Sequence, residues 1–297
     1  MQLIYLKLVF TMAIWGGTFI AGRIIAGEIS PFTASFYRFA IASIAILVIL
    51  SRQSIRLPRL KTSQLFYLVL LGLSGVFAYN AFFFLGLQTI PASRAGLIIA
   101  LNPVAIAIGS RIIFKDKLTI LQMIGVAISL LGVSLIITEG NIATIFSGGI
   151  GKGEFAIFGC VISWSIYSLI GKKVMQQLSP LLATTYAIFI GTLALFPPAI
   201  KEQMESGIES ITIFGCLSLL YLGILGTVVA FNWYYDGIQA IGAAKAAIFI
   251  NLVPVFALIF SVVFLKESIS SIILLGGVLV ITGVSLVNKK QKHKSVT

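Results

Sequence analysis

The chain has 297 residues, of which 59% are hydrophobic and 10% are charged, whereas a soluble domain carries about 25% charged residues. This composition, with a mean hydropathy of +1.08, excludes a soluble globular protein and indicates an integral membrane protein. The chain carries a net charge of +12, and a strongly positive charge is typical of nucleic-acid-binding proteins. Here, however, lysine and arginine gather at the ends of apolar runs rather than in one stripe. We therefore expect the lipid bilayer as a partner and no nucleic acid.

Apolar runs of about 20 residues, long enough to cross a hydrocarbon core of about 30 Å, recur from end to end with short connections. The predicted spans are 5–24, 32–50, 63–86, 93–113, 118–137, 153–171, 180–200, 211–235, 243–264 and 269–287. The first run lacks a small-residue cleavage site, so we expect a retained helix rather than a removed signal peptide. Cys160 and Cys216 lie within apolar runs without metal or redox spacing, and we interpret both as packing residues.

The sequence contains an internal repeat. Residues 86–135 recur 151 positions later, and earlier residues match at an offset of 149. The matched pairs include Trp15 with Trp164, Gly86 with Gly237, Pro103 with Pro254, and Gly132 with Gly283. Each copy contains five spans, an odd number, so the second copy must enter the membrane in the opposite orientation. The sequence therefore predicts inverted repeats, as in many secondary transporters.

The domain boundaries follow from the repeat. We expect the first repeat at 1–137, a periplasmic linker at 138–152, the second repeat at 153–287 and a basic cytoplasmic tail at 288–297. If both termini are cytoplasmic, most of the lysine and arginine residues lie on the cytoplasmic side, as the positive-inside rule predicts. We therefore expect a multi-pass protein with its N-terminus and C-terminus in the cytoplasm.

Arg38 is the one charge well inside a predicted span, about 10 Å beyond Pro31 at 1.5 Å per residue. An arginine within a membrane costs about 2.5–3.5 kcal/mol on insertion scales and normally faces a cavity or a partner. Its repeat counterpart is Ala187, so the repeat does not require an arginine here. We interpret Arg38 as a fixed positive charge that attracts a carboxylate or another anionic group. The alternative is an arginine that extends to the membrane surface or bonds to helix-end carbonyls.

Aromatic residues pair across the repeats near the middle of the spans. Trp15 and Trp164 are matched, and residues 82–84 match the aromatic residues 233–235. Such pairs could hold an organic substrate by stacking or by cation–π contact. The alternative is ordinary helix packing or an interfacial belt. The candidate wall and contact residues are Trp15, Tyr79, Asn80, Phe83, Trp164, Asn232 and Trp233.

Proline interrupts the fourth and ninth spans at Pro103 and Pro254, about halfway along each. Proline removes a helix hydrogen bond and opens a kink, and broken helices at the midplane are where transporters often bind substrate. Asn102 and Asn251 stand beside these breaks. They are candidates for polar contacts with the substrate, or they satisfy the broken backbone.

Glycines spaced by seven lie on one face of the fifth span and of the tenth. The pairs are Gly125 with Gly132 and Gly276 with Gly283. Small residues on one helix face permit close packing in a membrane. We therefore interpret these two helices as scaffold.

Several chemical groups are missing from the spans. No aspartate or glutamate lies deep in a span, and the single histidine, His293, lies in the tail, so the sequence offers no proton relay. The sequence contains no HExxH, no GxxxxGK and no nucleophile paired with a base. We expect neither an enzyme nor an ATP-driven pump, and no cofactor or metal.

Several segments carry a resemblance to a known family: WGGTF at 15–19, SPFTASFYRF at 30–39, PASRAGLIIALNP at 91–103, and the ends that begin KDKL at 115 and KESI at 266. In these segments the chain resembles the EamA family of the drug/metabolite transporter superfamily. The resemblance implies an all-α membrane protein of ten helices in two inverted five-helix repeats. It also implies a central cavity between the first four helices of each half, with the fifth and tenth set aside. A bacterial inner membrane and export of amino acids or related metabolites are implied as well.

Two residues bear on the resemblance. Asp116 stands where many members have glutamate, whereas Glu267 keeps that glutamate. Small multidrug efflux relatives use a glutamate in their first helix, which this chain lacks, and this disfavours exchange of cationic drugs.

We therefore predict a secondary transporter that exports a small polar metabolite, an amino acid or a related zwitterion, by alternating access. Arg38 would attract the substrate, Trp15, Trp164, Phe83 and Trp233 would form walls, and Asn102 and Asn251 would make polar contacts. An alternative is an exchanger of a larger metabolite such as a nucleotide-derived cofactor or S-adenosylmethionine. An alternative of another class is a membrane structural or assembly protein. A monomer or a homodimer is expected.

Overall fold

In the computed structural model of this protein, every element is a helix, and the described part of the chain contains no strand. The described residues are 2–52, 57–58, 60–114, 119–141, 151–174, 177–207, 210–241 and 249–287. Eight helices in them are long and apolar enough to cross a membrane, and two shorter apolar helices follow. The ten-span all-α fold is therefore confirmed.

The first two spans of the first repeat are uninterrupted α-helices, whereas the third and fourth spans are interrupted. The third span contains a π-helical segment, η1, and the fourth span breaks at residues 100–101, directly before Asn102 and Pro103. Proline is tolerated in the first turn of the new helix, where the missing N–H would have no helical partner. The elements are α1 (Gln2–Ala26), α2 (Pro31–Arg52), α3 (Thr62–Leu71), η1 (Gly72–Ala78), α4 (Tyr79–Thr89), α5 (Ala92–Ile99), α6 (Asn102–Phe114) and α7 (Ile120–Thr138).

The second repeat follows the same plan, including a π-helical segment, η2, in the matching span. The elements are α9 (Lys152–Val174), α10 (Pro180–Ser206), α11 (Ile213–Leu220), η2 (Tyr221–Val229), α12 (Ala230–Ile241), α14 (Leu252–Leu265) and α15 (Ser271–Val287). Side chains bond to carbonyls of both π-helical segments. Asn80 donates to the carbonyl of Val76 at 2.8 Å, and Thr227 donates to that of Leu222 at 2.9 Å.

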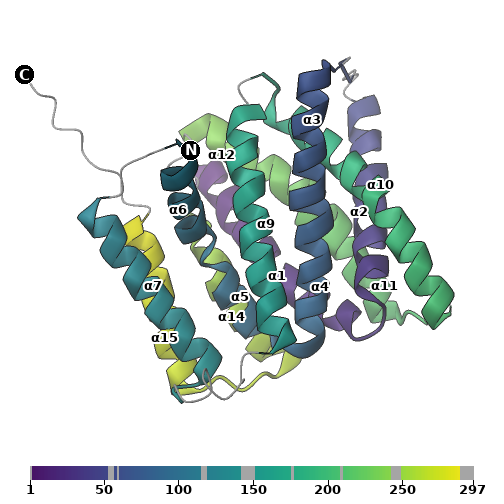
Figure 1. The fold of residues 1–297 in the computed structure, drawn as a ribbon. Coiled ribbons are helices and arrows are strands. Elements are labelled where there is room, and N and C mark those ends of the chain that lie inside the picture. The colour runs from purple at the N-terminus through teal and green to yellow at the C-terminus, as the bar shows by residue number, and fades with distance from the viewer. Residues whose placement is uncertain are drawn as a thin grey trace, which may run out of the picture.

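The two repeats run in opposite directions. In Figure 1, α1 descends from the N-terminus toward the lower end of the bundle, whereas its counterpart α9 ascends from that end. The contacts of α7 with α15 give the same result, because Gly125 meets Gly283 while Gly132 meets Gly276. As residue numbers rise along α7, the residues of α15 that they contact fall in number, so the two helices are antiparallel. The predicted inversion is confirmed.

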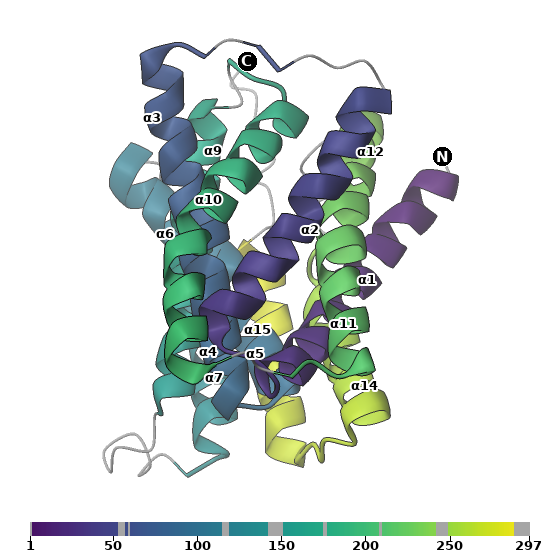
Figure 2. The ribbon, with the colours of Figure 1, turned by 90° about the vertical axis from the view of Figure 1, so that its right-hand side faces the viewer.

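The pair α7 and α15 forms one edge of the bundle, and α2 and α10 lie at the opposite edge (Figures 1 and 2). Added Cβ atoms on Gly125 and Gly132 would lie 2.6 Å from the carbonyl oxygens of Gly283 and Gly276. Backbones approach this closely only without side chains between them. The predicted glycine packing is confirmed.

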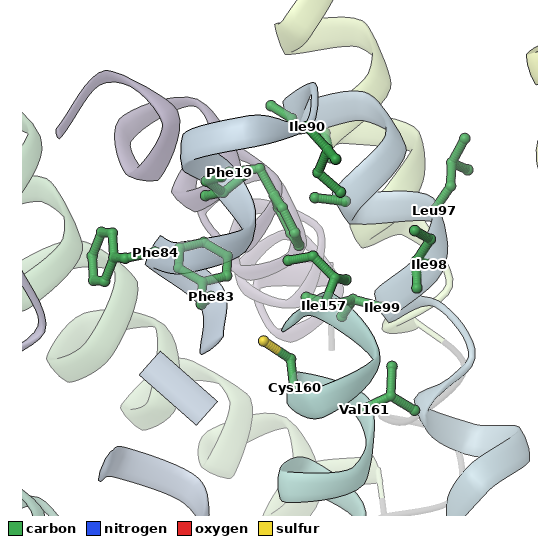
Figure 3. Packing of buried hydrophobic residues seen from close by; sticks show 14 of the residues in the cluster. Phe19, Phe83, Phe84, Ile90, Leu97, Ile98, Ile99, Ile157, Cys160 and Val161 are labelled. Atoms are coloured by element: carbon green, nitrogen blue, oxygen red, sulfur yellow. The ribbon is translucent and has the colours of Figure 1, made fainter. Parts of the chain in front are cut away.

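The main core joins α1, α4, α5 and α9, so it contains residues of both repeats. Figure 3 shows Phe19, Phe83, Ile157 and Cys160 in this core. Cys160 is buried, as predicted for a packing residue, but Cys216 is exposed on the outside of the bundle. The packing interpretation of Cys216 is wrong, because apolar surface that faces lipid and apolar surface that faces core give the same sequence signal.

Some predicted features lie outside the described residues. They are most of the linker (142–150), the tail (288–297), the start of the ninth span (242–248) and the positions of Lys115, Asp116 and Lys117.

Candidate functional site

A small cavity lies between the repeats, bordered by residues of α2, η1, α4, α9, α10, η2 and α12. Its volume of about 50 Å³ is enough for a few water molecules, because one water needs roughly 10–15 Å³ of such volume. Its polar and aromatic lining residues are Arg38, Phe39, Tyr79, Asn80, Trp164, Tyr167, Thr184, Thr227 and Phe231.

Arg38 supplies the positive charge at this cavity. Its side chain is buried, with 8% of the residue exposed, so it does not extend to the membrane surface. One guanidinium nitrogen, Nη1, donates to Asn80 Oδ1 at 3.0 Å, and the guanidinium carbon lies 5.2 Å from the centre of the Phe39 ring. Arg38 Nε is buried and has no hydrogen-bond partner, and no ion pair among the described residues includes Arg38. A buried donor without an acceptor is costly, so this arrangement suits an anionic ligand.

The cavity beside Arg38 is lined on its other side by a small residue from the matching position of the second repeat. Ala187, the counterpart of Arg38, lines the same cavity from α10, and Thr184 lies one helical turn before it. An arginine on one repeat therefore faces an alanine on the other. A larger residue at 187 would fill the volume beside the guanidinium.

Trp164 forms an aromatic wall of the cavity. It is half-buried, with its ring stacked on Tyr167 at 5.1 Å and tilted against Tyr79 at 5.4 Å. These neighbours come from the same helix and from α4, so they hold the indole between the repeats. A tryptophan face of this kind attracts organic cations as well as apolar groups.

Trp164 also borders a second cavity, which lies at the two helix breaks. This cavity of about 110 Å³ is lined mainly by apolar residues, with Asn102 and Asn251 as its polar ones. Asn102 Oδ1 is buried without a hydrogen-bond partner, and Asn251 Nδ2 lies 3.4 Å from Ser285 Oγ. Pro103 and Pro254 both line it, as expected if the breaks leave space around them.

The remaining predicted site residues line neither cavity. Trp15 donates from Nε1 to the carbonyl of Gly226 at 3.1 Å, and so holds η2 against α1. Phe83 is 1% exposed and packs in the core. Asn232 and Trp233 are half-buried on α12. The structure thus gathers Arg38, Tyr79, Asn80 and Trp164 at one cavity, and Asn102, Trp164 and Asn251 at the other.

Sequence reasoning missed five of the polar and aromatic residues that line the first cavity: Phe39, Tyr167, Thr184, Thr227 and Phe231. Two of them carried a signal, since Tyr167 lies one turn after Trp164 and Thr184 one turn before the counterpart of Arg38. Among the residues that the structure describes, no cluster of histidine, cysteine, aspartate and glutamate could hold a metal ion.

The chain matches the model of the EamA-like transporter family twice, at residues 2–138 and 151–289. It is 33% identical to the uncharacterized transporter YyaM of Bacillus subtilis (strain 168), over 95% of this chain and 92% of that protein. It is 31% identical to an uncharacterized transporter of Archaeoglobus fulgidus, over 97% and 98%. A protein of Streptantibioticus cattleyicolor named "Probable terminal-alkyne amino-acid exporter" is 26% identical, over 95% and 92%.

A solved crystal structure superposes with a TM-score of 0.66, at 18% identity, over 96% of this chain and 97% of that one. At this identity the likeness shows a shared fold. The two family matches cover both repeats and nearly the whole chain. The chain therefore belongs to the EamA-like transporter family.

Proposed function

We propose that this transporter exports a small solute with a carboxylate, an amino acid or a related zwitterion, across a bacterial inner membrane. The observation that carries the proposal is Arg38, a buried cation that lines a cavity and whose Nε has no partner. A carboxylate would accept from Nε and supply the missing countercharge. Asn80 would keep the guanidinium in place, because it already accepts from Nη1.

The other lining residues suit the rest of a zwitterion. An ammonium group next to the carboxylate would lie near the Trp164 face, where cation–π attraction operates. The hydroxyls of Thr184 and Thr227 offer acceptors on the same cavity. Tyr79 and Tyr167 would then act by holding the indole rather than by binding the solute directly.

The second cavity would take the side chain of the solute. It shares Trp164 with the first cavity and is lined mainly by apolar residues, while Asn102 and Asn251 provide amides at one wall. The relative from Streptantibioticus cattleyicolor is named for an amino acid with a terminal alkyne, which is an apolar group. This name supports an amino acid with an apolar side chain as the solute here.

In this conformation the two cavities, of about 50 and 110 Å³, are too small to hold such a solute, since the first has room for only a few waters. Binding and release would require the repeats to move relative to each other, as alternating access between inverted repeats provides. Trp15, Phe83, Asn232 and Trp233 would contribute to that frame rather than to contact with the solute. Both termini would lie in the cytoplasm.

The test is thermal stabilisation of the purified protein by a panel of amino acids, nucleosides, nucleotide-derived cofactors and organic cations, because a ligand of the folded state raises the melting temperature. We expect hits among amino acids, and we expect Arg38→Ala to remove them while Lys201→Ala, at a residue exposed on α10, keeps them. Counterflow in proteoliposomes then measures transport of each hit. Hits confined to cofactors or cations, or amino-acid hits that Arg38→Ala leaves unchanged, would overturn the proposal.

A further inference from the structure

Three glutamates meet the first turns of three helices at one end of the bundle. We call this end, at the bottom of Figure 1, the acidic end, and define it by Glu28, Glu202 and Glu267. All three residues are half-buried. None of them lines either cavity, so the site described above gives them no role.

Each glutamate accepts from both a backbone N–H and a hydroxyl. Glu28 accepts from Thr212, the residue that caps α11, through N at 2.9 Å and Oγ1 at 2.5 Å. Glu202 accepts from Thr33 N at 2.8 Å and Oγ1 at 3.0 Å in the first turn of α2. Helix N-termini favour negative charge, and hydrogen bonds to a carboxylate are about twice as strong as neutral ones.

Glu267 makes the third contact of this kind. It accepts from Ala92 N at 2.8 Å, and from Ser93 through N at 3.2 Å and Oγ at 2.5 Å, at the start of α5. The glutamate follows α14 in the second repeat, whereas α5 belongs to the first. Glu28 and Glu202 likewise join one repeat to the other. We name these three contacts the carboxylate clamps.

The repeat provides an internal comparison for one clamp. Gln177 is the counterpart of Glu28 at an offset of 149, and α3 is the counterpart of α11. At the opposite end Gln64 Nε2, in the first turn of α3, donates to Gln177 Oε1 at 3.3 Å. This contact joins the equivalent elements with the two repeats exchanged, but it is neutral and longer than the contacts of Glu28. An amide thus stands at the position where the other repeat has a carboxylate.

We propose that Glu28, Glu202 and Glu267 hold the acidic end of the transporter closed, so that its resting state opens preferentially at the opposite end. Rocking the repeats apart at the acidic end must break all three clamps. Among the described residues, opening at the other end breaks the Lys7–Asp236 ion pair at 2.6 Å and neutral or singly charged hydrogen bonds such as Gln64–Gln177 and Lys173–Tyr67. Three carboxylates therefore lose their partners at the acidic end, against one at the other end of the described part of the chain. The difference between the two ends sets which side of the membrane the cavity faces at rest.

The test measures accessibility in the full-length protein, purified in detergent, with Cys160→Ala and Cys216→Ala as background. Ile29→Cys reports on the acidic end, and Val174→Cys reports on the opposite end; both residues are buried, at 3% and 6% exposure. The rate of reaction with a hydrophilic maleimide is compared between the background and the triple variant Glu28→Gln, Glu202→Gln and Glu267→Gln. Glutamine keeps the shape of each side chain and removes its charge.

We expect the triple variant to raise the rate at Ile29→Cys by at least about five-fold, the ratio for weakening a single charged hydrogen bond to a neutral one. The rate at Val174→Cys should stay constant or fall. Glu205→Gln is the matched control, because Glu205 lies on α10 near Glu202. Its ion pair in the described part of the chain is with Lys201 of the same helix, at 3.7 Å, so this variant should change neither rate.

Gln177→Glu tests the proposal at the end opposite the acidic end. A carboxylate there should strengthen the neutral contact and also raise the rate at Ile29→Cys. An unchanged rate at Ile29→Cys in the triple variant would overturn the proposal. A rise at both reporters would overturn it as well, because that result means general loosening rather than release of one end. The readout is conformational, so it stands or falls separately from the identity of the solute.

Discussion

The glycine seam between α7 and α15 gives a sharp prediction, because two neighbouring glycines on α15 face different surroundings. A Cβ at Gly276 would lie 2.8 Å from the carbonyl oxygen of Gly132, a backbone atom that cannot move alone. A Cβ at Gly277 would lie 3.2 Å from Leu97 Cδ2, the end of a flexible side chain. We therefore compare Gly276→Ala with Gly277→Ala.

Both substitutions gain the same helix propensity, about 1 kcal/mol for glycine to alanine. Gly276→Ala additionally forces the two helices apart, and overpacking of this kind costs about 1–3 kcal/mol. The two variants should therefore differ by about 1–3 kcal/mol in stability. At roughly 2–4 °C per kcal/mol for a large domain, Gly276→Ala should melt about 2–12 °C below Gly277→Ala.

The assay is thermal unfolding of the purified variants in one detergent, with Gly132→Ala and the double variant Gly132→Ala with Gly276→Ala added. Once one alanine has separated the two helices, the second causes less steric overlap. The double variant should therefore lose less stability than the sum of the losses of the two single variants. Equal melting temperatures for Gly276→Ala and Gly277→Ala would refute the close backbone packing. Additive losses of stability would refute a direct contact between Gly132 and Gly276.

Three further predictions concern the cavity and its frame. Ala187→Leu should fill the space beside Arg38 and weaken solute stabilisation at least about ten-fold in concentration. Because Ala187 is buried, the larger side chain should also lower stability by about 1–3 kcal/mol. Trp15→Phe should remove the hydrogen bond to Gly226, lower stability by about 1 kcal/mol and leave the solute concentration dependence unchanged. Asn80→Leu should leave the buried Arg38 charge without its acceptor, lower stability by about 3 kcal/mol and abolish solute stabilisation. Thermal unfolding with and without the solute measures all three, and a Trp15→Phe protein that no longer responds to solute would contradict the placement of Trp15 outside the cavities.

The spans were predictable because hydropathy adds up over a whole helix. The second predicted span, 32–50, lies inside α2 at Pro31–Arg52, and the fifth, 118–137, overlaps α7 at Ile120–Thr138. The inversion followed from counting alone, since five is odd. The π-helical segments were not predicted, because an extra residue in one turn leaves the composition of the span unchanged.

The candidate site was only partly predictable. Arg38 was identified because a charge inside a span is expensive wherever it points, and the structure places it at a cavity with Asn80. Trp15 and Trp164 look equivalent in the sequence, yet Trp15 bonds to η2 while Trp164 borders both cavities. A repeat alignment cannot separate them, because it reports which positions correspond and not which of two matched side chains lies beside a lone arginine.

The two proposals depend on positions where the repeats differ. In a perfectly symmetric pair of inverted repeats, the conformations open at either end are related by the two-fold axis of the repeats and have equal free energy, so neither is preferred. Replacing one charged hydrogen bond by a neutral one, as Gln177 does relative to Glu28, changes the balance by about 1 kcal/mol, or about five-fold in population. Arg38 opposite Ala187 breaks the same symmetry at the centre, where one positive charge and one small residue create a site for one anionic group instead of two. A carboxylate bound there would contact both repeats at once, so its binding could change the balance between the two open states that the carboxylate clamps set at rest.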